Sequence, residues 1–125
     1  LVDLSDFLPT LAGVMGAEVP EEPVIDGRSF LPQLLGEPGE PREWVTIYSN
    51  PRPEKPNKNP RAFFARDKRY KLYDDGRFFD CVADPKEREP LMTEEFSDEA
   101  RQARAVLQGA LDSAPPEPVH LRPSR

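Results

Sequence analysis

Proline is the feature that most limits how this chain can fold. Sixteen of its 125 residues are proline, about 13% against an average near 5%. Proline has no amide hydrogen and a fixed φ, so long helices and inner strands can form only between its clusters. Two such clusters lie in residues 17–42 and 50–60, and we therefore expect short elements joined by extended segments.

Composition narrows the classes of function. Apolar residues make up only 37% of the chain, and charged residues make up 32% with a net charge of −6. This acidic balance disfavours binding to nucleic acids or to anionic membranes, and no apolar run is long enough to span a bilayer. The single cysteine excludes an intramolecular disulfide or a cysteine-built zinc site, and the single histidine, His120, makes a histidine-based catalytic centre improbable.

The first forty residues predict a helix that cannot stand alone. Residues 1–16 place apolar side chains at helical spacing, with Asp6 suited to the N-cap and Gly16 to the C′ position. A helix of about ten residues is marginal by itself, so it must dock on another surface. Residues 17–42 then predict a proline-rich wrapping segment with one helical turn in SFLPQLL. Because the chain opens at Leu1 without a signal peptide, we expect a fragment or a processed chain.

The remainder predicts an antiparallel sheet followed by a helix. EWVTIYS and the segment RAFFARDKRYKLYDDGRFFDCV supply four strands, with turns expected at Asp67–Lys68 and, as a type I′ turn, at Asp75–Gly76. Ser97 should cap a helix with one apolar face. The expected class is α+β, with a small four-stranded antiparallel sheet and a packed C-terminal helix. The expected divisions are a helix and wrapping segment (1–42), a sheet subdomain with helix (43–114) and a loose tail (115–125).

Few residues could carry chemistry. Cys81 lies between Asp80 and Asp84, which would raise its pKa, so a small apolar residue at a strand end is favoured over a nucleophile. The carboxylate pairs Asp74–Asp75 and Asp80–Asp84 could bind metal, but no EF-hand spacing occurs and the turn explanation is favoured.

A basic and aromatic stretch could instead form an anion-binding sheet face. Its bases alternate with aromatic side chains, as an ordinary sheet with one apolar and one solvated face would also require. The residues are Arg61, Arg66, Lys68, Arg69 and Lys71, with Phe63, Phe64, Tyr70 and Tyr73.

Three stretches, in order, resemble the C-terminal region of the sulfatase family (arylsulfatase-type, in the alkaline phosphatase superfamily). LVDLSDFLPTLAGVMG is similar to the family's D-L-x-P-T-L helix, and IDGRSFLPQLLGE resembles its D-G-x-S-x-x-P-x-L-x-G segment. RAFFARDKRYKLYDDGRFFDCVADPKEREPL is similar to the pattern of its terminal sheet, R-A-x-R-x-x-x-Y-K-L followed by D-L-x-x-D-P-x-E. The chain departs from this pattern at Cys81 and Pro90.

The resemblance implies a sulfuric ester hydrolase whose chemistry lies elsewhere. In that family a formylglycine, made within C/S-x-P-x-R, acts beside calcium in an upstream domain, and neither that motif nor matching ligands occur here. We therefore expect no catalytic, cofactor-binding or metal-binding residues in this chain, which alone would be inactive. Its role would be scaffold and cleft wall for hydrolysis of a sulfated small molecule or saccharide. A periplasmic or secreted parent enzyme is expected.

Two hypotheses remain. The first is the sulfatase subdomain, with an apolar docking surface along Leu4, Phe7, Leu11 and Leu31, and with the loop residues Arg52, Lys55 and Lys58 as candidate substrate contacts. The alternative is an independent small binding module for an anionic ligand, with a closed core.

Overall fold

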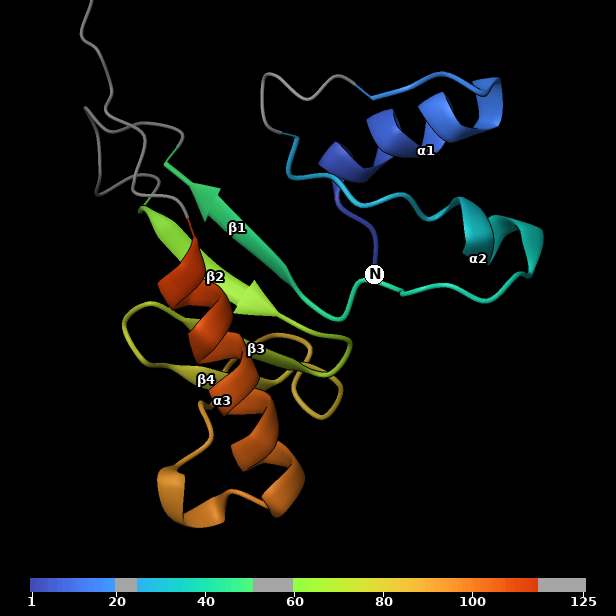
Figure 1. Ribbon diagram of the computed structural model, residues 1–125. Helices are drawn as coiled ribbons and strands as arrows, with labels where there is room; N and C mark the ends of the chain where they lie inside the picture. The colour runs from blue at the N-terminus through green and yellow to red at the C-terminus, as the bar shows by residue number, and fades with distance from the viewer. Residues whose placement is uncertain (20–24, 51–59, 115–125) are drawn as a thin grey trace, which may run out of the picture. The chain divides into compact units, whose positions relative to one another are not determined.

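The computed structural model describes residues 1–19, 25–50 and 60–114. The chain forms two compact units, Leu1–Val45 (unit 1) and Thr46–Arg125 (unit 2), and each is considered by itself (Figure 1). No helix among the described residues has both the length and the apolar character needed to cross a membrane.

Unit 1 contains short helices that begin and end where the sequence predicts. A 3-10 turn, Leu4–Asp6, leads into α1, Phe7–Met15, which ends at Gly16 with a left-handed φ of 65°. The second helix, α2, Leu31–Leu35, ends in the same way at Gly36. Glycine adopts this conformation without the steric cost that a Cβ would add, so both helices end there.

Unit 2 contains the predicted sheet, and strands that follow one another in the sequence are also neighbours in the sheet. The strands are β1 (Val45–Ser49), β2 (Ala62–Arg66), β3 (Tyr70–Tyr73) and β4 (Phe78–Asp80), arranged β1-β2-β3-β4. The pairs β2–β3 and β3–β4 are antiparallel, with Ala65 opposite Leu72 and Leu72 opposite Phe78. These three side chains share one face of the sheet and are almost fully buried.

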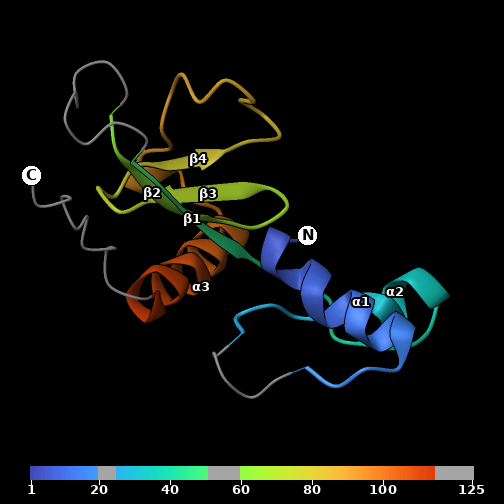
Figure 2. The same cartoon turned by 90° about the horizontal axis from the view of Figure 1, so that it is seen from above.

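A C-terminal helix covers that face. Helix α3, Asp98–Ser113, begins where the Ser97 side chain accepts a hydrogen bond from the Ala100 amide at 3.1 Å, as the sequence predicts. It packs against β2 and β3 (Figure 2) and contributes buried Ala100, Leu107, Ala110 and Leu111. The α+β class with a four-stranded antiparallel sheet and packed helix is thereby confirmed.

The β3–β4 hairpin has the predicted place but a different turn. Strand β3 ends at Tyr73, and the Gly76 amide donates to the Tyr73 carbonyl at 3.0 Å. Gly76 has φ 90°, whereas Asp75 does not have a positive φ, so the type I′ prediction is wrong. The loop is instead a three-residue connection with glycine at its left-handed last position. The Asp67 carboxylate fixes the other hairpin by accepting the amides of Arg69 and Tyr70.

Replacing Gly76 with Val should destabilise unit 2 by about 1–2 kcal/mol, because a β-branched residue is strained at positive φ. A Cβ at this position would meet no atom within 4 Å, so the cost would come from the backbone alone. The measurement is the midpoint of urea unfolding. Gly109→Ala is the control, since Gly109 lies in α3 with equal open space, and this change should stabilise by about 0.5–1 kcal/mol. An unchanged midpoint for Gly76→Val would contradict the turn geometry.

Candidate functional site

A buried carboxylate organises unit 1. The side chain of Asp6 accepts the Arg28 amide at Oδ1 and the Asp3 amide at Oδ2, both at 2.8 Å. The Arg42 guanidinium binds both oxygens, with Nε 2.8 Å from Oδ2 and Nη2 paired with Oδ1. Asp6 occupies the predicted N-cap position of α1 but makes no side-chain cap bond, because its oxygens have these other donors.

Thr10 and Gly27 complete this arrangement. The Thr10 hydroxyl donates to the Asp6 carbonyl at 2.7 Å and accepts the Phe30 amide at 3.0 Å. At Gly27 a Cβ would lie 2.0 Å from the Ser5 carbonyl oxygen, so only glycine permits this approach of the two segments. The first two stretches that resemble sulfatases are thus parts of one hydrogen-bonded arrangement, which we call the Asp6 clasp.

The Asp6 clasp holds an apolar surface open to solvent. Leu4 is 87% exposed and Met15 is 74% exposed, and further apolar side chains from both helices are about half exposed or more. Leu31, which we expected on this surface, is half-buried instead, since its Cδ2 lies 3.1 Å from where a Cβ of Gly13 would be. The exposed set, called the apolar face below, is Leu4, Phe7, Leu8, Leu11, Val14, Met15, Leu34 and Leu35.

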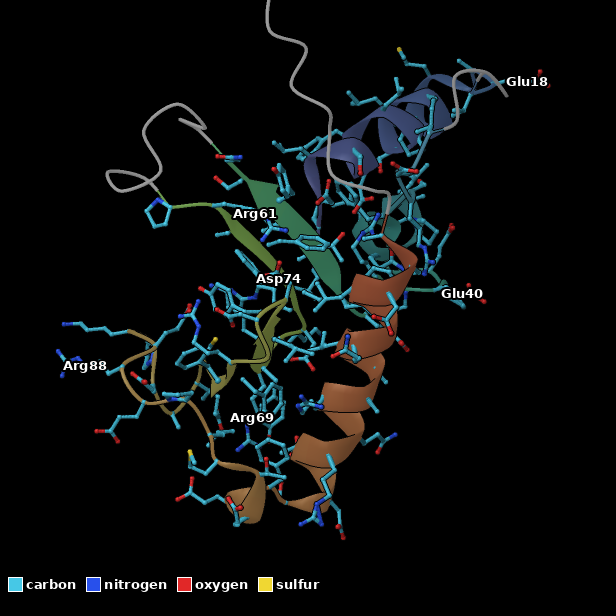
Figure 3. The ribbon with its side chains drawn as sticks, turned by 90° about the vertical axis from the view of Figure 1, so that its left-hand side faces the viewer. Glu18, Glu40, Arg61, Arg69, Asp74 and Arg88 are labelled. Carbon is cyan, nitrogen blue, oxygen red and sulfur yellow. The ribbon has the colours of Figure 1, made fainter. Side chains whose placement is uncertain are left out.

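Acidic groups of the chain itself neutralise most of the sheet's bases. Arg69 pairs with Asp80 at 2.8 Å and with Glu99 at 2.7 Å. Arg61 pairs with Asp74 at 2.5 Å (Figure 3). Because carboxylates already pair with these bases, an external anion would have to displace them, which disfavours the predicted anion-binding face, although Lys68 is exposed. The remaining pairs are Lys71–Glu87 and Arg77–Asp75, while Arg66 donates to the Asp67 carbonyl.

A polar cluster on the sheet face opposite α3 was not predicted. Glu87 accepts from Lys71 Nζ at 2.7 Å and from the Tyr73 hydroxyl at 2.6 Å. The ammonium of Lys71 also lies 3.9 Å from the ring centroid of Phe64, which favours its charged form. Burial, together with the hydrogen bond to Glu87, raises the pKa of Tyr73. Glu87 itself has φ 51°, a strained value for a non-glycine residue, which these two bonds stabilise.

The loop after β4 is fixed by two carboxylates. Asp84 accepts the amides of Lys86, Arg88 and Glu89 at 3.3, 2.5 and 3.0 Å, and these bonds lower its pKa. Asp80 accepts the amides of Val82 and Ala83 in the same way. These carboxylates therefore shape the backbone. Among residues 1–19, 25–50 and 60–114, no group of three His, Cys, Asp or Glu side chains is close enough together to hold a metal ion.

Cys81 lacks the features of a nucleophile, whereas the predicted substrate contacts stay predictions. Cys81 is half-buried, and burial, followed by the charge of Glu87, raises the pKa of its thiol, which disfavours a nucleophilic thiolate. Arg52, Lys55 and Lys58, the predicted substrate contacts, lie outside the described residues, as does His120.

Solved structures share this fold. One is BT4656 in complex with its substrate D-glucosamine-2-N,6-O-disulfate, with TM-score 0.63 and 23% identity, matched over 86% of this chain and 23% of that one. Another is BT33336S-sulf, from a study of glycosaminoglycan metabolism by Bacteroides thetaiotaomicron, with TM-score 0.56 and 17% identity, matched over 86% and 24%. This chain thus has the fold of about a quarter of each sulfatase-related neighbour. No protein-family model and no curated protein matches it.

The Asp6 clasp should respond to acid in a defined range. Burial alone would raise the pKa of Asp6, but the bonds from Arg42, Arg28 and Asp3 lower it to about 2 from its ordinary 3.8. A lowered pKa in the folded state means that the stabilisation, of about 2 kcal/mol, is complete above about pH 4 and is lost as the pH falls toward 2.

The Arg28 amide proton, followed by NMR from about pH 6 downward, should report this titration with a midpoint near pH 2. Asp6→Asn should remove the transition, whereas Asp98→Asn, at a fully exposed position in α3, should leave it unchanged. A midpoint near that of an ordinary exposed aspartate, about 3.9, would contradict the buried ion pair.

Proposed function

We propose that this chain is the C-terminal subdomain of a sulfatase, and that it serves as scaffold and cleft wall for an upstream catalytic domain. The observation that carries the proposal is the fold shared with two sulfatase-related structures, of which this chain spans 23% and 24%. In this proposal the formylglycine and calcium that hydrolyse the sulfate ester belong to the upstream domain. None of the chain's own residues takes part in bond cleavage.

The geometry of unit 1 supports a docking role. Eight apolar side chains of the apolar face are exposed to solvent, although removing such groups from water is favourable. The Asp6 clasp keeps their helices in fixed positions with hydrogen bonds rather than with an apolar core of their own. Covering such a surface with a second apolar surface would be favourable, and the upstream domain is the partner we propose.

Unit 2 would then form the wall of the cleft. Its core is closed by α3, and its ion pairs hold the sheet and loops without help from another chain. A rigid subdomain of this kind can present loops toward a substrate that the upstream domain cleaves. The substrate class we propose is a sulfated saccharide, by analogy with the disulfated glucosamine that BT4656 binds.

The first test is direct. The coding region immediately upstream should encode a C/S-x-P-x-R motif, and the purified 125-residue chain, with its mass confirmed, should show no turnover of a chromogenic aryl sulfate. The reason is that the chain contains no such motif. Turnover by the isolated chain, or an upstream region without the motif, would contradict the proposal.

The apolar face gives a second test. In the isolated chain, Leu8→Glu combined with Leu11→Glu should reduce the fluorescence of an apolar dye, because both side chains are more than half exposed. In the parent enzyme the same pair should lower the melting temperature and the activity, since two charges would be buried at the docking surface without partners.

Val106→Glu is the matched control, because Val106 is an exposed apolar residue of unit 2 outside the apolar face. It should leave the parent enzyme's melting temperature and activity nearly unchanged. If the double variant and the control behave alike in the parent enzyme, the apolar face is not the docking surface.

A further inference from the structure

The loop that follows β4 encloses two shallow hollows that share three residues. The smaller has a volume of about 310 Å³ and is lined by Ala83, Asp84, Pro85, Lys86 and Arg88. The larger, of about 600 Å³, also contacts Ala83, Asp84 and Arg88, and its other lining residues include the acidic Asp80, Glu89 and Glu95. Arg88 therefore borders both hollows, and Figure 3 shows it directed outward from the loop.

The cations of this loop differ from those of the sheet. Arg69 and Lys71 are matched by carboxylates, whereas neither Lys86 nor Arg88 takes part in an ion pair within the described residues. Both side chains are exposed. The carboxylate of Asp84 lines the same hollow and keeps its negative charge, although it accepts hydrogen bonds from three backbone amides. The smaller hollow is thus lined by two positive charges and one negative charge, in a chain with a net charge of −6.

The backbone between these cations is held in place before any ligand arrives. Glu87 separates them in the sequence, and its side chain points to Lys71 and Tyr73 with two short hydrogen bonds. Lys86 and Arg88 therefore flank an anchored residue, whose φ is positive. The Leu91 amide closes the loop by donating to the Phe78 carbonyl at 2.8 Å. A loop ordered in advance loses little conformational entropy when it binds.

We propose that the hollow over Ala83 and Pro85 is a binding site for a sulfated saccharide, with Lys86 and Arg88 as the donors to a sulfate group. Arginine and lysine are suited to sulfate oxygens because they bind them with charge-assisted hydrogen bonds. The apolar surfaces of Ala83 and Pro85 would contact the C–H face of the sugar ring. The choice of a saccharide rests on the proposed function. The hollow itself is observed in this chain and does not depend on that proposal.

The test uses the 125-residue chain and NMR titration of its backbone amides. The probe is D-glucosamine-2-N,6-O-disulfate, with N-acetylglucosamine as the uncharged sugar and inorganic sulfate as the anion without a sugar. The disulfated sugar should shift the amides of Ala83, Lys86 and Arg88 at lower concentration than inorganic sulfate does. N-acetylglucosamine should shift none of them. Equal affinity for inorganic sulfate and for the disulfated sugar, or shifts confined to other residues, would overturn the proposal.

Matched variants separate this site from general charge. Lys86→Gln with Arg88→Gln should weaken binding about tenfold or more, as expected for the loss of charge-assisted bonds. Lys68→Gln with Arg101→Gln removes the same charge from exposed positions elsewhere in unit 2 and should change the affinity little. Equal weakening by the two pairs would overturn the assignment.

The outcome also separates this inference from the proposed function. The dye and melting-temperature experiments depend on the apolar face of unit 1, which neither pair of variants alters. If the docking experiment fails but the disulfated sugar still binds at Lys86 and Arg88, the proposed sulfatase subdomain is overturned and this binding site is kept. If the docking experiment succeeds but the disulfated sugar does not bind at Lys86 and Arg88, only this binding site is overturned.

Discussion

The fold of unit 1 depends on one buried carboxylate. Asp6 gathers two backbone amides and the Arg42 guanidinium, and so it ties the start of α1 to segments 22 and 36 residues further along the chain. A buried charge with so many donors is stabilising only as a complete set, since the loss of one partner leaves the others unmatched. The same bonds leave the apolar side chains of both helices free to face outward, so the polar interactions inside the unit define its apolar surface.

The sequence predicted the elements better than the interactions between them. Periodicity and turn residues located α1, α3 and the four strands because these signals are local. The Asp6–Arg42 pair was missed, since nothing in the sequence indicates which of several arginines meets a carboxylate 36 residues away. Likewise, Asp75–Gly76 marked a hairpin, but the choice between a two-residue and a three-residue loop depends on strand register.

The basic stretch shows why charge patterns alone did not locate a site. Along the sequence, Arg61, Arg69 and Lys71 form a cationic strip, but folding places a carboxylate against each of them. Lys86 and Arg88 do not form a basic pattern in the sequence, because Glu87 and Glu89 alternate with them. The fold draws the Glu87 side chain to Lys71 and Tyr73 and leaves its basic neighbours exposed, which only the structure could reveal.

The anchoring of the loop after β4 also separates positions that are constrained from positions that can change. Asp84, Glu87 and Leu91 hold the backbone through their side chains or amides, whereas Lys86 and Arg88 contribute to that frame only through main-chain atoms. A substitution at either of these two positions therefore alters the chemical character of the surface without altering its shape. Point mutations at these two positions could therefore change the charge of this surface with no insertion and with the backbone hydrogen bonds of the loop retained.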